Sequence, residues 1–408
     1  PYERKSVCRI SPSISAVYAG VRIQIFGPVQ RLDETGNKIM RRTARGEKMM
    51  MSEEFEKELK QRIREIQPAD QKSMEAAAAH WKTVGKPLYS LGKLEEAVIR
   101  MAGIRGKADY TIEKKGLVIM CADNGVVAEG VTQTGQEVTA IVAENFTRRA
   151  TSVCLMAEIA GADLFPVDIG MASDVPAVTK PEYKVMYGTK DMLYEPAMTR
   201  EQAAKAVLTG IHIVEKLAGQ GYDLLATGEM GIGNTTTSSA VAAVLLGREV
   251  EEVTGRGAGL SSEGLNRKVD VIRRSIGLHH PDREDVLDVL SKVGGLDIAG
   301  LAGVFLGGAL CHIPVIIDGF ISSAAALCAS RLCSAAADYM MPSHKSGESA
   351  GGIMLEALGL SPFIDCNMSL GEGSGAVAVI PLLEMGLSVY REMSTFDEIH
   401  VEQYKEYK

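Results

Sequence analysis

The chain has 408 residues, of which 46% are hydrophobic and 24% are charged, so it can form the core of one or two soluble globular domains. Its formal net charge of -8 argues against a nucleic-acid-binding surface. The most apolar stretch, residues 298–311, is shorter than the roughly 20 residues that a membrane-spanning helix needs, and it indicates a buried helix that packs through small residues.

The first 48 residues differ in charge from the rest of the chain. They contain 10 Lys and Arg against 4 Asp and Glu, so they carry +6 and the remaining 360 residues carry -14. Residues 45–48 can be encoded by a purine-rich run that looks like a ribosome-binding site, and three methionines follow. We interpret residues 1–48 as a non-native or disordered extension, translated from upstream sequence in error. A genuine basic extension is the alternative.

Three amphipathic helices are expected next, over residues 52–67, 69–84 and 90–106. The first has a serine cap followed by glutamates, and the third ends at a glycine. We expect residues 52–105 to build a small helical domain together with helices of the C-terminal segment, residues 346–408.

Short apolar runs then alternate with helical segments. The runs occupy residues 116–123, 162–170, 222–230, 313–320 and 337–344. This alternation predicts an α/β fold over residues 106–345, with a parallel, Rossmann-like sheet and helices on both faces. Ligands of such sheets bind at the carboxyl ends of the strands. Polar residues and glycines stand there: Asp123, Asn124, Gly125, Gly228, Glu229, Asp318, Gly319, Ser343 and His344.

A strand, a glycine-rich loop and a helix follow one another in residues 227–247. Gly231 and Gly233 allow a ligand to approach the backbone closely. Asn234 or a following threonine can cap the helix, whose N-terminus favours an anion. The loop is therefore a candidate phosphate site, although it lacks the GxxxxGK[ST] pattern of a P-loop. A structural turn between strand and helix is the alternative.

A second glycine-rich stretch, residues 254–274, adds cations. Arg256 and Lys268 have the charge to bind a phosphate. A solvated lysine on a helix surface is the alternative for Lys268.

Two glutamates, Glu229 and Glu372, stand between glycines in apolar surroundings. Such surroundings disfavour the charged form of a carboxyl group, raise its pKa and make it a competent general base near neutral pH. A carboxylate stabilised by a helix N-terminus is the alternative for Glu372.

No metal-binding pattern accompanies these glutamates. The seven cysteines include no CxxC pair, no histidine stands at a metal-binding spacing from a cysteine, and no paired acidic loop for magnesium pyrophosphate occurs. We therefore expect neither metal nor cofactor. Scattered free thiols are typical of a reducing cytoplasm, where we expect the protein to be located.

The motifs together resemble one family over about residues 52–390. The chain resembles the nicotinate-nucleotide–dimethylbenzimidazole phosphoribosyltransferases of cobalamin lower-ligand biosynthesis. The matching pieces, in family order, are KPLYSLGKLE, ADNGVVAEGV, QEVT, GEMGIGNTT, GRGAGL, GGLDIAGLAG, IPVIIDGFISSAAAL, SHKS, LEALGLSPFIDCNMSLGEGSGA and MSTFDE.

The resemblance implies transfer of the phosphoribosyl group of nicotinate mononucleotide to 5,6-dimethylbenzimidazole or a related base, with inversion at the ribose carbon. It makes Glu372 the general base and Glu229 the second functional glutamate, as an anion near the developing positive charge of the ribose. It also implies a homodimer, for which the small residues of 298–311 suit close packing at a core or an interface. It places the following residues around the substrates: Gly231, Gly233, Asn234, Thr235, Thr236, Lys268, Arg256, Gly257 and Ser346 at the phosphate and ribose, and Asn124, Thr132, Gln133, Gln136, Leu370 and Gly371 at the base.

The sequence departs from the family pattern near the expected base site. Asn124 replaces a histidine, residues 132–135 replace Ser-Ala-Tyr-Pro, and Tyr89 replaces a glycine whose space it can partly fill. The preferred base is therefore left open between benzimidazoles, purines and phenolics.

The sequence argues against two other classes of function. A catalytically idle homologue that acts as a binding module is disfavoured because both glutamates are present. A dinucleotide-dependent oxidoreductase is excluded because no GxGxxG opens the first strand–helix unit.

Overall fold

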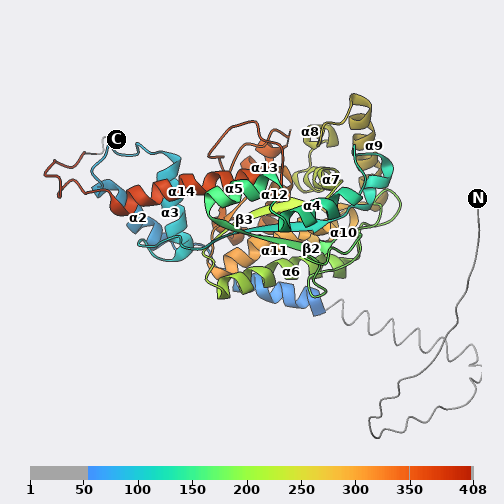
Figure 1. Cartoon of the computed structure of the whole chain (residues 1–408), viewed down its shortest axis with the longest axis horizontal. Helices are drawn as coiled ribbons and strands as arrows, with labels where there is room; N and C mark the ends of the chain where they lie inside the picture. The colour runs from blue at the N-terminus through green and yellow to red at the C-terminus, as the bar shows by residue number, and fades with distance from the viewer. Residues whose placement is uncertain (1–53, 349, 406–408) are drawn as a thin grey trace, which may run out of the picture. The chain divides into compact units, whose positions relative to one another are not determined.

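A computed structural model describes residues 54–348 and 350–405, which belong to a compact unit formed by residues 49–408. The expectation for residues 1–48 lies outside the described residues. The unit is built on a five-stranded parallel sheet of order β2-β1-β3-β4-β5 (Figure 1). The strands are β1 (Lys115–Ala122), β2 (Ala162–Gly170), β3 (Leu224–Met230), β4 (Val315–Ile316) and β5 (Met340–Met341). The predicted α/β fold is therefore confirmed, and each strand overlaps its predicted run.

The strand order creates a crevice at the carboxyl ends of β1 and β3. The chain passes from β1 outward to β2 and then returns to the other side of β1 as β3, so the direction of winding reverses between these two strands. Ligands of open α/β sheets bind at such a switch point. The strands that flank it are apolar because both faces are covered: all of β3, and all of β1 except Lys115, is buried.

Helices cover both faces of the sheet (Figure 1). On one face lie α6 (Arg200–Gly219) and α11 (Leu296–Cys311), and on the other lie α4 (Glu137–Thr147), α5 (Ser152–Ala160) and α14 (Ser374–Glu392). Helix α12 (Phe320–Leu332) packs against α11 and against α7 (Asn234–Leu246). The remaining elements are α2 (Gln71–Thr83), α3 (Lys93–Arg105), α8 (Val250–Val253), α9 (Ser262–His279), α10 (Val286–Val293), α13 (Gly351–Ala357) and two 3-10 helices, η1 (Gly125–Glu129) and η2 (Ser334–Tyr339).

The small-residue run of α11 packs inside the chain. A Cβ atom on Gly303 would lie 1.9 Å from the carbonyl oxygen of Val207, and one on Gly210 would lie 2.0 Å from that of Gly300. The backbones of α6 and α11 therefore meet where glycines face each other. Of the two places that the sequence allowed for this run, the core is the one observed, because α11 is buried up to Ala309.

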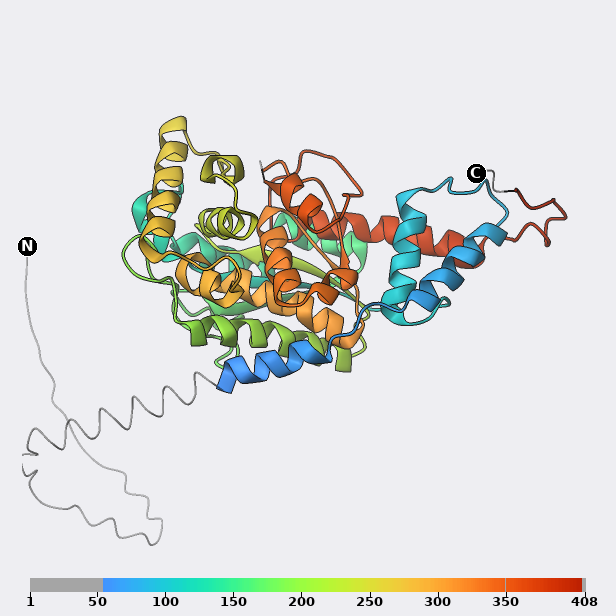
Figure 2. The same cartoon turned by 180° about the vertical axis from the view of Figure 1, so that it is seen from behind.

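Helices α2 and α3 lie beside the C-terminal part of α14 at one end of the unit (Figure 2). The rings of Trp81 and Tyr390 have centroids 5.1 Å apart, and Lys86 forms a buried ion pair with Glu95 at 2.6 Å. The helix over residues 54–65 lies instead along α6 and α11. Domain boundaries near residues 105 and 345 remain a prediction.

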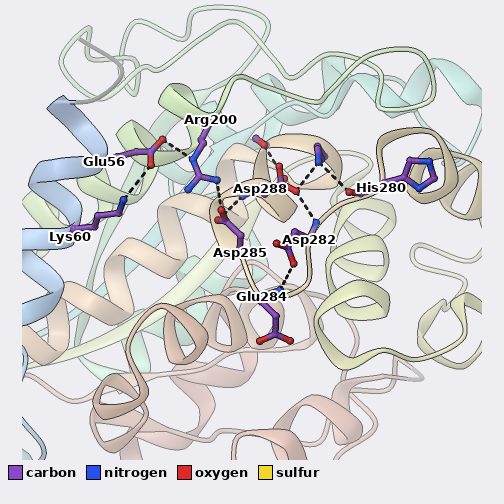
Figure 3. A network of polar contacts seen from close by, with 10 residues as sticks. Glu56, Lys60, Arg200, His280, Asp282, Glu284, Asp285 and Asp288 are labelled. Carbon is purple, nitrogen blue, oxygen red and sulfur yellow. Dashed lines mark hydrogen bonds and ion pairs between the residues drawn. The ribbon is translucent and has the colours of Figure 1, made fainter. Parts of the chain in front are cut away.

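Arg200 connects this first helix, residues 54–65, to the N-terminus of α10. Its guanidinium contacts Glu56 Oε1 and Asp285 Oδ2, each at 2.7 Å (Figure 3). Asp285 is also the N-cap of α10, because its side chain accepts from the backbone N–H of Asp288. Burial acts to raise the pKa of Asp285, but the hydrogen bonds from Arg200 and from the N-terminus of α10 hold it below its usual value.

We expect Arg200→Ala to lower the free energy of unfolding by about 1 kcal/mol, because it removes two charge-assisted hydrogen bonds from a half-exposed site. Urea unfolding measures the change. Lys60→Ala is the matched control: Lys60 also lies near Glu56, but its side chain is 66% exposed and 3.9 Å away, so stability should not change. Equal losses for the two variants would contradict the assignment.

Candidate active site

A cavity of about 260 Å³ lies at the carboxyl ends of the strands. Its wall is formed by the end of β3, the loop into α7, the loop before α9, and the segments that follow β4 and β5. Residues 369–372, which precede α14, complete the wall. Segments far apart in the sequence therefore meet at the carboxyl edge of the sheet, where parallel α/β sheets bind their ligands.

Most of the residues expected around the substrates line this cavity. They are Glu229, Gly231, Gly233, Asn234, Thr235, Arg256, Gly257, Ser346, Thr132, Gln133, Leu370, Gly371 and Glu372. Four expected residues lie outside the wall, namely Thr236, Lys268, Asn124 and Gln136. All four are buried or hydrogen-bonded behind the wall.

Glu229 lies at the buried end of β3 and shares a partner with a second carboxyl group. The side-chain amide of Asn234 donates to Glu229 Oε2 and, over 3.0 Å, to Asp297 Oδ2. Burial, followed by repulsion from Asp297, raises the pKa of Glu229 to about 8, and burial raises that of Asp297 to about 6. The Glu229 carboxyl therefore holds its proton more strongly than an exposed glutamate does.

The N-terminus of α7 points toward the same cavity without a side-chain cap. Gly233 is the N-cap residue with φ 92°, a left-handed conformation that favours glycine. The predicted cap by Asn234 is replaced, because its amide is bound to the two carboxyl groups. The uncapped helix end is a good anion site. Thr236 points away from the cavity and is fully buried.

Lys268 is fully buried beneath the glycine loop before α9. Its Nζ donates to Thr235 Oγ1 at 2.9 Å and to the carbonyl oxygen of Gly255 at 3.1 Å. Burial lowers the pKa of Lys268 to about 8, although nearby Glu348 acts in the opposite direction. The solvated-lysine alternative is thus wrong. The ammonium group of Lys268 lies behind the cavity wall and contacts Thr235, which lines the cavity.

Glu372 stands at the centre of an unusual turn. Gly371, Glu372 and Gly373 have φ angles of 85°, 61° and 95°, so three consecutive residues are left-handed. This conformation costs a non-glycine residue about 1–2 kcal/mol. Burial raises the pKa of Glu372, with the backbone N–H of Val153 acting against it, and Oε2 is a buried atom without a hydrogen-bond partner. The strain and the unpartnered oxygen are typical of a functional carboxyl group.

The expected base-binding residues fall into two groups. Gln133 lines the cavity, but its Nε2 donates to the carbonyl oxygens of Ala258 and Gly259, so it joins the loop after η1 to the glycine loop before α9. Asn124 and Gln136 lie behind the wall. The Asn124 side chain contacts the Ile232 carbonyl and Thr237, and Gln136 donates to the Asn124 backbone at 3.0 Å.

Tyr89 also lies away from the cavity wall. It is 57% exposed in a turn before α3 and has φ 59°, which explains why glycine is the family residue at this position. Tyr89 therefore does not fill space in the cavity of this chain, contrary to the expectation from the sequence.

Sequence reasoning did not assign a site role to several residues of the wall, among them Asp318, His344, Ile321 and Met230. The signal for the first two was available, because both follow apolar strands and the carboxyl ends of parallel strands share one edge. Within residues 54–348 and 350–405, no group of three or more His, Cys, Asp or Glu side chains has a metal-binding arrangement. No helix of this part of the chain is long and apolar enough to cross a membrane.

A parallel α/β sheet with a helix N-terminus and two glutamates in the wall of one cavity has the construction of an enzyme that acts on a phosphorylated substrate. The sequence model of a family described as Phosphoribosyltransferase matches residues 66–401. A nicotinate-nucleotide–dimethylbenzimidazole phosphoribosyltransferase of Acetivibrio thermocellus is 44% identical over 345 residues, which cover 85% of this chain and 98% of that protein. One of Chloroflexus aggregans is 46% identical over 351 residues, with coverage of 85% and 99%.

The solved structures agree. CobT from Thermus thermophilus matches with a TM-score of 0.78 at 36% identity, over 82% of this chain and 100% of that chain. The chain therefore belongs to the nicotinate-nucleotide–dimethylbenzimidazole phosphoribosyltransferase family, and the resemblance seen in its motifs is confirmed.

Proposed function

We propose that the protein transfers the phosphoribosyl group of nicotinate mononucleotide to 5,6-dimethylbenzimidazole or a related base, giving α-ribazole 5′-phosphate and nicotinate for the cobamide nucleotide loop. Family membership supports this activity. The observation that carries it is the single cavity whose wall contains Glu229, Glu372 and residues of the uncapped N-terminus of α7.

In this proposal the phosphate of the nucleotide binds at the N-terminus of α7, with the charge of Lys268 behind it. Glu372 takes the N–H proton of the incoming base while its nitrogen forms a bond to the ribose anomeric carbon. The bond between that carbon and the pyridinium nitrogen breaks, and its electron pair neutralises the leaving nicotinate ring. The reaction balances without a metal ion, because the leaving group is already cationic.

Glu229 acts on the ribose in this scheme. Burial and Asp297 raise its pKa to about 8 in the free protein, which disfavours the ionised form. A bound pyridinium cation favours the ionised form of a nearby carboxyl group. Substrate binding thereby supplies the anion that stabilises the developing positive charge on the ribose.

The test is release of nicotinate from nicotinate mononucleotide with a panel of benzimidazoles, purines and phenolics. We expect release that depends on an added base, together with a new riboside phosphate, and the panel identifies the preferred base. Omission of the base is the control. No release with any base would favour an idle homologue.

We also propose a cytoplasmic homodimer. Exposed apolar side chains on two neighbouring helices support association: Leu155 and Ile159 of α5 are 62% and 84% exposed, and Met385 of α14 is 59% exposed. The cysteines of the described residues are free thiols, which suits a reducing compartment. Light scattering tests the dimer, and a fully active monomer at micromolar concentration would rule it out.

A division into domains is part of the same proposal. An α/β domain over residues 106–345 would stand beside a small helical domain built from parts of residues 52–105 and 346–408. The contacts of Trp81 with Tyr390, and the bridge between Val84 and Thr395, support the pairing of the two terminal segments.

A further inference from the structure

One buried carboxylate outside the proposed chemistry holds the turn that carries Glu372. Asp318 follows β4 and is only 2% exposed. Its Oδ2 accepts from the backbone N–H of Gly373 at 3.1 Å, and its Oδ1 accepts from those of Gly375 and Ala376 at 2.8 and 3.0 Å. Asp318 therefore gives α14 the N-terminal cap that its own N-cap residue, Gly373, cannot supply.

Asp318 is itself fixed from three sides. Its backbone N–H lies 3.3 Å from Thr227 Oγ1 of β3 and 3.2 Å from Ser322 Oγ of α12. Its carbonyl oxygen accepts from Ser343 Oγ, after β5, at 2.9 Å. Hydroxyl groups of three elements thus hold the residue, so its carboxylate is a rigid anchor for the chain that it binds.

The turn at Glu372 needs such an anchor, because Gly371, Glu372 and Gly373 are all left-handed. The turn also fits tightly against its neighbours. A Cβ atom on Gly228 would lie 2.4 Å from the Glu372 carbonyl oxygen, and one on Gly375 would lie 1.8 Å from His344 Nδ1. A strained backbone conformation persists only when its surroundings over-determine it.

We propose that Asp318 is a positioning residue for the reaction, which acts by holding the 371–376 turn so that the Glu372 carboxyl faces the substrates. This inference rests on the proposed function, in which Glu372 is the general base. Asp318 makes no transfer itself, because both of its carboxylate oxygens are occupied by backbone N–H groups. Burial raises the pKa of Asp318, while nearby His344 and the three N–H groups favour its ionised form.

The test is a double-mutant cycle of Asp318→Asn and Glu372→Gln in the full chain. Asparagine keeps the shape, but its NH₂ group replaces one acceptor and opposes a backbone N–H. We expect kcat for nicotinate release to fall about 10–100-fold, as misplacement of a reacting group does, with the KM for nicotinate mononucleotide unchanged. The double variant should be no slower than Glu372→Gln alone, because Asp318 acts through Glu372.

Asp168→Asn is the matched control. Asp168 is equally buried and also accepts a backbone N–H, that of Met171 at 2.8 Å, but it stabilises the segment after β2. This variant should lower the unfolding temperature and leave kcat unchanged. If Asp318→Asn does not fold, Ser343→Ala replaces it as a milder loosening of the anchor, and its smaller loss of kcat should likewise vanish in the Glu372→Gln background.

Hydrogen exchange of the peptide that spans residues 370–377 gives a readout that does not depend on turnover. Asp318→Asn should speed its exchange, because the amides that face the new NH₂ group lose their acceptor. If Asp318→Asn speeds exchange but the wild-type protein releases no nicotinate, Asp318 still holds the turn and the proposed function is rejected. Unchanged exchange or a native kcat in Asp318→Asn would overturn the inference. So would a double variant in which the kcat losses of the two single variants multiply.

Discussion

Turnover of Glu372→Gln with an N–H base should fall about 10²–10⁴-fold, which is the usual contribution of general-base catalysis. Glutamine preserves the shape of the side chain and removes the proton acceptor. Binding of the base should change much less, because the apolar part of the cavity remains. Steady-state kinetics with nicotinate mononucleotide and the preferred base measure both quantities.

The pH profile distinguishes this role from a structural one. A general base acts only when it is deprotonated, and burial raises the pKa of Glu372 above its ordinary value of 4.5. The kcat of the wild-type protein should therefore rise with pH through that raised pKa, and Glu372→Gln should lack this limb. Near-native turnover of Glu372→Gln at neutral pH would make the carboxylate a structural group and leave Glu229 as the first candidate base.

Replacement of Lys268 should mainly weaken binding of the nucleotide. Lys268→Met keeps most of the buried volume and removes the charge behind the α7 N-terminus. Lys268 donates to Thr235, so its charge acts on the phosphate indirectly. A loss of about 1.4 kcal/mol corresponds to a tenfold change, so the KM for nicotinate mononucleotide should rise about 10-fold. Arg274→Ala removes a cation from the same helix, α9, at a position that is 60% exposed, and it should leave the KM unchanged.

The titration of Lys268 adds a test in the alkaline range. Burial lowers its pKa to about 8, so the cation is present below that pH and is lost above it. The kcat/KM of the wild-type protein should therefore fall as the pH rises through about 8. Glu229 titrates in the same range and its ionisation has the opposite effect. The informative comparison is with Lys268→Met, in which the fall should be absent. A KM that is insensitive to Lys268→Met would show that the buried cation does not act on the phosphate.

The sequence predicted the sheet well because of how parallel strands are buried. A strand that helices cover on both faces must be apolar throughout, so β1 and β3 appear as continuous apolar runs. The polar residues directly after such runs collect at one edge of the sheet, which is why Glu229 could be placed in a site before the structure was known. The glycines beside Glu372 marked it as a candidate site residue, and the structure adds that they form a left-handed turn with it.

The sequence by itself thus determined the fold class, the edge of the sheet where the cavity lies and the family. Only the tertiary structure decided which side chains reach that cavity. Lys268 lies behind the wall, Thr236 faces the interior, and the Asn234 amide binds two carboxyl groups instead of capping α7. The physical reason is that the direction of a side chain depends on partners far away in the chain. Asp318 binds a turn more than 50 residues later, and the pKa of Glu229 is raised by its burial and by Asp297. Such pairings leave no local pattern, so they become visible only when the chain is folded.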